Sequence, residues 1–145
     1  MRPIAVLGAG SWGTALAIHL GRIGHSVRLW SRAPALAETM RSKRFNLNYL
    51  PDIKLPPTVE PTSLLTSAIE NVDFVVVAVP TPLHVSCSLP FLAEGVACLV
   101  EKPLAPDPEQ CRTLIEAAEN SGAALGTGHV ERFNPAFRRA LELGI

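Results

Sequence analysis

The sequence lacks an excess of charge of either sign. Lys and Arg together number 13, and Asp and Glu together also number 13, in a chain of 145 residues. Because no net field results, we expect neither nucleic acid nor a membrane surface as a partner. Long hydrophobic runs are missing too, since the longest, at residues 74–80 and 96–100, are far shorter than a membrane-spanning helix. A secretory signal pattern is also absent, which predicts a cytoplasmic protein.

Cysteine is scarce. Cys87, Cys98 and Cys111 are odd in number and show no Cys-x-x-Cys spacing. Cys98 falls in an apolar strand pattern, and the other two fall in helical patterns. We therefore expect three buried free thiols and no metal site.

A regular alternation of strand and helix patterns is present instead. Hydrophobic residues make up 48% of the chain and charged residues 18%, which suits a single globular domain. Apolar runs predict strands at residues 4–7, 26–30, 58–60, 74–79, 96–100 and 123–126. Helical spacing predicts helices at residues 14–23, 33–43, 83–93 and 135–143. A short helix capped by Ser63 and a longer one from the N-cap Asp107 to Gly122 complete the pattern.

Two proline-containing segments interrupt this alternation. Pro51, Pro56 and Pro57 lie in what we expect to be a long loop before the third strand. Pro90 either kinks its helix or marks the true start of that helix. Six strands that alternate with helices predict an α/β Rossmann fold: a doubly wound, parallel, six-stranded sheet of order 3-2-1-4-5-6, in one domain over residues 1–145.

A glycine-rich turn, Gly8-Ala9-Gly10-Ser11-Trp12-Gly13, follows the first expected strand and opens the first expected helix. Gly8 permits a tight turn, Gly10 lets a pyrophosphate approach the backbone, and Gly13 lets the helix pack closely on the strand. Backbone N–H groups and the positive end of the helix dipole would hold the phosphates. Strand, turn, helix and second strand fall within about 30 residues, the length of a dinucleotide-binding unit. The sequence therefore predicts that NAD or NADP binds at this turn.

The end of the second strand bears on the choice between the two cofactors. An NAD site places an acidic residue about 20 positions past the motif, where it bonds the ribose 2′-hydroxyl. This sequence has Leu29-Trp30-Ser31-Arg32 there and no carboxylate. Arg32, with Ser31, would suit a 2′-phosphate, although a solvated surface arginine is the alternative. We expect NADP to be favoured and NAD to be accepted.

Two motifs in the first half of the chain suggest a family. They are the run Ser11-Trp12-Gly13-Thr14-Ala15-Leu16-Ala17 and the loop Asn46-Leu47-Asn48-Tyr49-Leu50-Pro51, with Leu29–Arg32 and Leu55-Pro56 in support. Through them, residues 1 to about 70 resemble the N-terminal domain of bacterial NAD(P)-dependent glycerol-3-phosphate dehydrogenase. The resemblance implies cofactor contacts from Ser11, Trp12, Arg32 and Tyr49. Without it, Trp12 and Tyr49 would be interpreted as ordinary packing residues.

From about Asp73 onward the motifs differ. They are Ala78-Val79-Pro80-Thr81-Pro82-Leu83-His84, Val100-Glu101-Lys102-Pro103-Leu104-Ala105 and Gly128-His129-Val130-Glu131-Arg132-Phe133-Asn134-Pro135. This half resembles the glucose–fructose oxidoreductase and inositol dehydrogenase family, above all its nucleotide-sugar dehydrogenases.

The second resemblance implies that Lys102 is a catalytic lysine beside the nicotinamide and the substrate hydroxyl, where its ammonium would polarise the hydroxyl or relay a proton. A solvated lysine at a strand end is the alternative. The resemblance also implies a candidate cis bond between Lys102 and Pro103. Implied cofactor contacts come from Glu101, Val79, Pro80, Thr81 and His84.

The histidines and an arginine of these motifs have competing interpretations. His84 and His129 fit hydrogen-bonded loop or cap residues near the cofactor edge better than proton carriers. Arg132 would anchor an acidic group or pair with Glu131.

The two resemblances meet at a seam between Glu60 and Asp73, which suggests a chimera that arose by engineering or by recombination. Both families place their substrate pocket in a C-terminal domain, and this sequence ends before one. We therefore expect the NAD(P)-binding domain of a CH–OH dehydrogenase, with little or no turnover in isolation.

Two other interpretations remain open at this point. One is a hybrid Rossmann scaffold without a working nucleotide site, and the other is an enzyme that completes its site by dimerisation. The amphipathic pattern at 135–143 predicts a helix that partly covers the apolar edge of the crevice, with weak homodimer formation.

Overall fold

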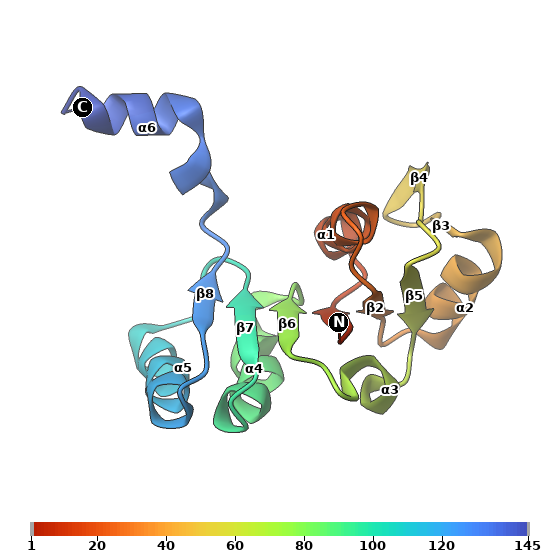
Figure 1. Cartoon of the computed structure of the whole chain (residues 1–145), viewed down its shortest axis with the longest axis horizontal. Coiled ribbons are helices and arrows are strands. Elements are labelled where there is room, and N and C mark those ends of the chain that lie inside the picture. Colours follow the sequence, from red (N-terminus) through yellow and green to blue (C-terminus); the bar gives the residue numbers. More distant parts are fainter. Residues whose placement is uncertain (1, 145) are drawn as a thin grey trace.

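A computed structural model, which describes residues 2–144, shows one parallel sheet with helices on both faces (Figure 1). Every neighbouring pair of strands in this sheet is parallel. The observed order corresponds to the predicted 3-2-1-4-5-6 and confirms the doubly wound Rossmann fold. Across the sheet, the strands are β5 (Val59–Thr62), β2 (Val27–Trp30), β1 (Ile4–Leu7), β6 (Phe74–Val77), β7 (Ala97–Val100) and β8 (Leu125–Thr127).

Short apolar strands form the centre of the sheet because alternate side chains can be buried on both of its faces. Ala5 and Leu7 of β1 pack in one buried cluster, together with Leu92 and Leu114 of the helices on that face. Val6, between them, packs in the cluster on the opposite face. The helices are α1 (Ser11–Arg22), α2 (Pro34–Lys43), α3 (Leu65–Ile69), α4 (His84–Ala93), α5 (Pro108–Ser121) and α6 (Pro135–Glu142).

The capping signals of α5 act as the sequence predicts. The Asp107 side chain accepts a hydrogen bond from the Gln110 N–H at 2.9 Å, and the Gln110 amide returns a bond to Asp107 at 2.6 Å. Gly122 ends the helix in the left-handed conformation, with a φ of 74°.

Several helix boundaries differ from the predicted ones. α1 begins at Ser11, three residues earlier than expected, because Gly10 is its N-cap. The start of α3 is held by Thr62, whose hydroxyl accepts the Leu64 N–H at 3.1 Å, so the assignment of Ser63 as the cap is wrong. Pro90 lies inside α4 and does not mark its start, because a 3₁₀ turn, η1 (Thr81–Leu83), leads directly into that helix.

The expected long loop before the third strand contains a two-stranded antiparallel hairpin, β3 (Phe45–Asn46) and β4 (Leu50–Lys54). Pro51 fits within β4 because the outer side of a two-stranded hairpin needs no N–H donor. Leu55, just beyond β4, is fully buried and secures the hairpin to the core.

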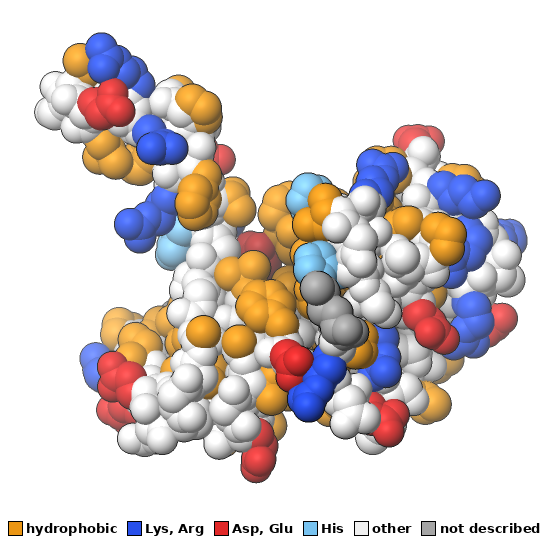
Figure 2. Space-filling view, viewed as in Figure 1, with side chains coloured by type: hydrophobic (Ala, Val, Ile, Leu, Met, Phe, Trp, Pro, Cys, Tyr) orange, Lys and Arg blue, Asp and Glu red, His pale blue; other side chains and the backbone are white. Residues whose placement is uncertain are grey.

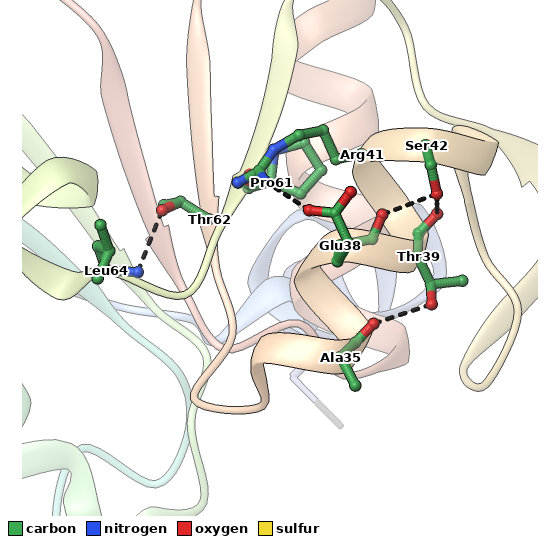
Figure 3. A network of polar contacts seen from close by, with 8 residues as sticks. All are labelled: Ala35, Glu38, Thr39, Arg41, Ser42, Pro61, Thr62 and Leu64. Carbon is green, nitrogen blue, oxygen red and sulfur yellow. Dashed lines mark hydrogen bonds and ion pairs between the residues drawn. The ribbon is translucent and has the colours of Figure 1, made fainter.

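Figure 3 shows the polar contacts around α2 and the outer strand β5, which one of these contacts joins. Arg41 forms an ion pair with Glu38 at 2.7 Å and donates a hydrogen bond to the Pro61 carbonyl at 3.2 Å. The bond to Pro61 joins the C-terminal half of α2 to the edge strand, while the ion pair lies within the helix.

Cys98 is buried, whereas Cys87 and Cys111 are only half-buried, and all three thiols are free. The predicted burial is therefore wrong for Cys87 on α4 and for Cys111 on α5. Neighbouring elements cover these two helical positions only in part. Burial raises the pKa of the Cys98 thiol to about 12.

The C-terminal segment departs most from expectation. After β8, a 3₁₀ turn, η2 (Val130–Phe133), leads into α6, which projects away from the sheet (Figures 1 and 2). Phe137 and Leu141 are exposed along this helix. The expected partial covering of the crevice by α6 is thus wrong, because the connection through η2 directs the helix outward.

Candidate functional site

The glycine turn adopts a conformation that only small residues allow. Gly8 has a φ of 112°, and a side chain there would collide with the Ala78 carbonyl of the neighbouring segment. A side chain at Gly13 would collide with the Gly8 carbonyl, so the close packing of α1 on the turn depends on Gly13. Gly10 differs, since no atom lies within 4 Å of the position that its Cβ would take. Its missing side chain leaves open space over the turn.

The N-terminus of α1 opens on this space. Gly10 is the N-cap, and no side chain caps the helix there. The N–H of Thr14 bonds the Gly10 carbonyl at 2.9 Å and closes the first turn. The N–H groups that precede Thr14 in the helix are the ones that an α-helix leaves without intrahelical partners. Such groups, at the positive end of the helix dipole, form a site for an anion.

A cavity of about 440 Å³ lies against the turn, at the carboxyl ends of β1, β2 and β6. Doubly wound sheets bind their ligands at this edge, where the strand order reverses. Its lining includes seven residues that the sequence predicts as cofactor contacts: Gly8, Gly10, Ser31, Arg32, Tyr49, Val79 and Pro80. No Asp or Glu is among the residues that line it.

The other lining residues were not predicted, and most of them are apolar. Five of them directly flank predicted positions, so proximity in sequence was the available signal: Ala9, Trp30, Ala33, Ala78 and Leu83. Leu36 and Cys87 lie one helical turn further along the chain, in α2 and α4. Together, all of these residues give the cavity apolar walls around a few polar groups, the usual make-up of a small-molecule site.

Arg32 and Ser31 lie on the β2 side of the cavity. Ser31 is buried, and its hydroxyl oxygen accepts the Ala33 N–H at 3.2 Å just before α2 begins. Arg32 is exposed, and no carboxylate pairs with it among residues 2–144. The arginine therefore contributes an unneutralised positive charge to the rim.

Cys87 lies on the α4 side of the same cavity. Burial raises the pKa of its thiol, an effect that a hydrogen bond with Ser86 partly offsets. The thiol is therefore protonated and weakly nucleophilic near neutral pH.

Trp12, Glu101 and Lys102 form a second group, outside the lining of the cavity, at the carboxyl end of β7. The indole N–H of Trp12 donates a hydrogen bond to the Glu101 carboxylate, and the backbone N–H of Lys102 also donates to it, at 3.2 Å. The Lys102 side chain is exposed, and the peptide bond to Pro103 is cis, as the second resemblance implies.

His84 is fully buried beneath this edge of the sheet. Its Nε2 lies 2.9 Å from the Val79 carbonyl, and its Nδ1 lies 2.9 Å from the Pro103 carbonyl. The imidazole thus links the segments that follow β6 and β7 and has no ring nitrogen directed at the cavity. This placement fits the hydrogen-bonded cap residue that the sequence suggests, at the start of α4, because backbone carbonyls occupy both ring nitrogens.

The remaining predicted residues do not line the cavity. The hydroxyl of Ser11 donates to the Tyr49 carbonyl at 2.8 Å, so its proton is already engaged. Thr81 begins η1, while His129 and Arg132 are exposed at the base of the projecting segment. Among the described residues, no three His, Cys, Asp or Glu side chains gather as a metal site requires.

A wider hollow of about 630 Å³ lies at the other end of α1, lined in part by Arg22, Arg44 and Lys54. It shares no residue with the predicted site and contains no glycine turn. The chemistry of the lining, and not the size, therefore identifies the smaller cavity as the candidate site.

A parallel sheet of this order, with a glycine turn, an uncapped helix N-terminus and a cavity at its carboxyl edge, defines a Rossmann-type dinucleotide-binding domain. A profile of the family described as NAD-dependent glycerol-3-phosphate dehydrogenase N-terminus matches residues 3–89. Because this match covers more than half of the chain, the chain belongs to that family and is an NAD-binding domain of the dehydrogenase type. The match also continues beyond Asp73, where the motifs alone suggest that the likeness ends.

Individual relatives agree with this assignment. An NAD(P)+ glycerol-3-phosphate dehydrogenase of Thioalkalivibrio sulfidiphilus is 52% identical over 79 residues, which are 54% of this chain and 24% of that protein. The crystal structure of glycerol-3-phosphate dehydrogenase from Coxiella burnetii matches with a TM-score of 0.69 and 31% identity, over 87% of this chain and 39% of that chain.

A solved structure of a nucleotide-sugar dehydrogenase shares the fold. The UDP-N-acetylglucosamine 3-dehydrogenase from Acidithiobacillus ferrooxidans matches 99% of this chain and 43% of its own, with a TM-score of 0.79 and 23% identity. The chain thus spans less than half the length of each of these relatives. Within the described residues, no helix is both long enough and apolar enough to cross a membrane.

Proposed function

We propose that the chain binds NADP or NAD across the glycine turn, with NADP favoured. One observation carries the proposal: a single cavity joins the exposed backbone of the turn, the cation of Arg32 and the end of β6, and no carboxylate lines it. The backbone N–H groups at the start of α1 would hold the pyrophosphate. The apolar wall formed by Trp30, Leu36 and Leu83 suits an adenine ring.

The preference for NADP rests on charge. A 2′-phosphate near Arg32 would gain charge-assisted hydrogen bonds, whereas a 2′-hydroxyl there would find no acidic acceptor in the lining. NAD would still bind through the pyrophosphate and the adenine, which are common to both dinucleotides.

Lys102 is the proposed catalytic residue of the dehydrogenase to which this domain belongs. Its ammonium is exposed at the carboxyl edge of the sheet, and the Glu101 carboxylate holds its backbone N–H. A bound nicotinamide supplies or accepts hydride. The role of Lys102 would be to hold a substrate hydroxyl and to pass on the proton of that hydroxyl.

The isolated chain has little or no turnover in this proposal. Its relatives are more than twice its length, and the part of them that this chain does not span would carry further groups that contact the substrate. A substrate would therefore lack groups that orient it against the nicotinamide.

We also propose mixed parentage and a cytoplasmic location. The Glu101-Lys102-Pro103 motif lies outside residues 3–89, the part that the family profile matches, and this position supports a chimera of two dehydrogenase families. The free state of all three cysteines supports a reducing compartment.

Gly10→Val tests the binding site directly. The open space at Gly10 and its extended backbone accept a side chain without disturbing the fold, and that side chain would occupy the place of the pyrophosphate. We expect fluorescence titration to show that NADPH and NADH binding is lost while the thermal melting curve is kept. Undiminished affinity in the folded variant would refute the assignment.

A further inference from the structure

Asn46, at the end of β3, has a buried side chain between the hairpin and the start of α1, with a relative exposure of 0%. Its amide nitrogen donates to the Ala9 carbonyl at 2.9 Å and to the Thr14 hydroxyl at 2.8 Å. Its amide oxygen accepts the Tyr49 N–H at 3.3 Å. Both N–H donors of the amide are thus used toward the glycine turn and α1, and the oxygen is used within the hairpin.

The two bonds donated by Asn46 reach the glycine turn at Ala9 and the first turn of α1 at Thr14. Ala9 is the central residue between Gly8 and Gly10, and Thr14 is the residue whose N–H closes the first turn of α1. The bond from the Ser11 hydroxyl to the Tyr49 carbonyl adds a third tie between the hairpin and the helix start. The hairpin therefore holds the whole of residues 9–14.

We propose that Asn46 is a positioning residue for dinucleotide binding, which sets the direction of the N–H groups of the glycine turn. The proposal rests on the proposed function and extends it to a residue outside the cavity. No side chain caps α1, so the backbone alone aims these groups. Glycines at positions 8 and 10 leave that backbone free to move, and the Asn46 amide removes this freedom.

Two substitutions at Asn46 distinguish the effect of its N–H donors from the effect of its side-chain volume. Asn46→Asp keeps the shape and the oxygen that accepts the Tyr49 N–H, but it places an acceptor against the Ala9 carbonyl. Asn46→Ala removes every side-chain hydrogen bond of this residue and leaves the Ala9 carbonyl without the Asn46 amide. Thr14→Val is milder, since it removes one acceptor at nearly constant volume and leaves the bond to Ala9.

The matched control is Asn48→Ala. Asn48 is exposed in the turn of the same hairpin and makes no side-chain hydrogen bond among the described contacts. The Asn48→Ala substitution removes a carboxamide side chain from the same hairpin, as Asn46→Ala does.

The experiment uses the whole chain at a temperature where circular dichroism shows each variant fully folded. NADPH and NADH are titrated by fluorescence, and amide hydrogen exchange is followed without a dinucleotide. We expect both Asn46 variants to raise the dissociation constants for NADPH and NADH about tenfold and about equally, because the pyrophosphate is common to both. Exchange at residues 9–14 should quicken while β7 and α5 keep their protection. Thr14→Val should show a smaller loss, and Asn48→Ala none.

When the chain binds a dinucleotide, two results would overturn the proposal. One is a folded Asn46→Asp variant with unchanged affinity and exchange, and another is faster exchange throughout the sheet, which would indicate general stabilisation. If the unsubstituted chain binds neither dinucleotide, the proposed function fails by itself. The exchange measurement then decides on Asn46, since local quickening at residues 9–14 supports the positioning role and no change refutes it. If Asn46→Ala does not fold, Asn46→Asp and Thr14→Val decide in the same way.

Discussion

The indole N–H of Trp12 donates a hydrogen bond to the carboxylate of Glu101, although 89 residues separate the two in the chain. Trp12 belongs to the glycine turn and Glu101 to the end of β7, so the bond crosses above β6. It joins the glycine turn to the Glu101-Lys102-Pro103 segment, which belong to the two halves of the chain that carry different sequence resemblances. The two halves are thus coupled at the edge where the cavity lies.

Removing this bond should cost stability. We expect Trp12→Phe to lower the free energy of unfolding by about 0.5–1 kcal/mol, less than a buried bond to a charged group contributes, because Trp12 is 47% exposed. Glu101→Gln should cost less, since an amide oxygen still accepts the indole N–H. Urea denaturation followed by far-UV circular dichroism measures both. Unchanged midpoints would show that the bond contributes nothing in solution.

Arg32 should discriminate between the cofactors. Arg32→Ala removes the positive charge from the rim of the cavity, and we expect it to weaken NADPH binding by about 1.5–3 kcal/mol while NADH binding is nearly unchanged. Isothermal titration calorimetry measures both affinities. Arg22→Ala, a surface arginine outside the cavity, is the control and should affect neither. Equal losses for the two dinucleotides would refute the 2′-phosphate assignment.

Cys87 should report occupancy of the cavity. Because burial raises the pKa of its thiol, the reactive thiolate is scarce at neutral pH and accumulates only as the pH rises beyond the usual thiol range. We therefore expect slow alkylation by iodoacetamide near neutral pH, a steep increase at alkaline pH, and slower reaction when NADPH is bound. Peptide mass spectrometry follows each cysteine.

Cys111 is the internal control for that experiment. It is half-buried on α5 and does not line the cavity, so NADPH should leave its alkylation rate unchanged. Protection of both cysteines would indicate a general stiffening of the protein, and protection of neither would place the dinucleotide elsewhere.

Much of the fold was predictable because its signals are local. The strand at Ile4–Leu7, the glycine turn after it and the cap at Asp107 each depend on residues close together in the chain. Alternation of such units then restricts the topology to a few parallel sheets, of which the observed order is a common one.

What escaped prediction depends on contacts between distant segments. The role of Asn46 follows from its burial against Ala9 and Thr14, which lie more than 30 positions away. The Trp12–Glu101 bond is of the same kind. The outward direction of α6 follows from the geometry of η2, for which the hydrophobic pattern of the helix carries no information.

Activity should be absent from the chain by itself. We expect no NADP-linked oxidation of glycerol 3-phosphate or of nucleotide sugars, because the chain spans less than half the length of its dehydrogenase relatives and would lack groups that orient a substrate. The assay monitors NADPH absorbance at protein concentrations high enough to detect a slow reaction. Robust turnover, lost in Lys102→Met, would show that the site is complete without a further domain.

The projecting helix should make the chain associate weakly with itself. Phe137 and Leu141 lie four residues apart, so they share one face of α6, and both are exposed. An exposed apolar face on a charged helix gains free energy when a second copy covers it. We expect light scattering to show an average mass that rises with concentration, and Phe137→Ser with Leu141→Ser to abolish the rise. Arg138→Ser, an exposed change on the same helix, should leave it intact. A mass that stays monomeric at every concentration would show that this face gains too little from a second copy to hold a dimer.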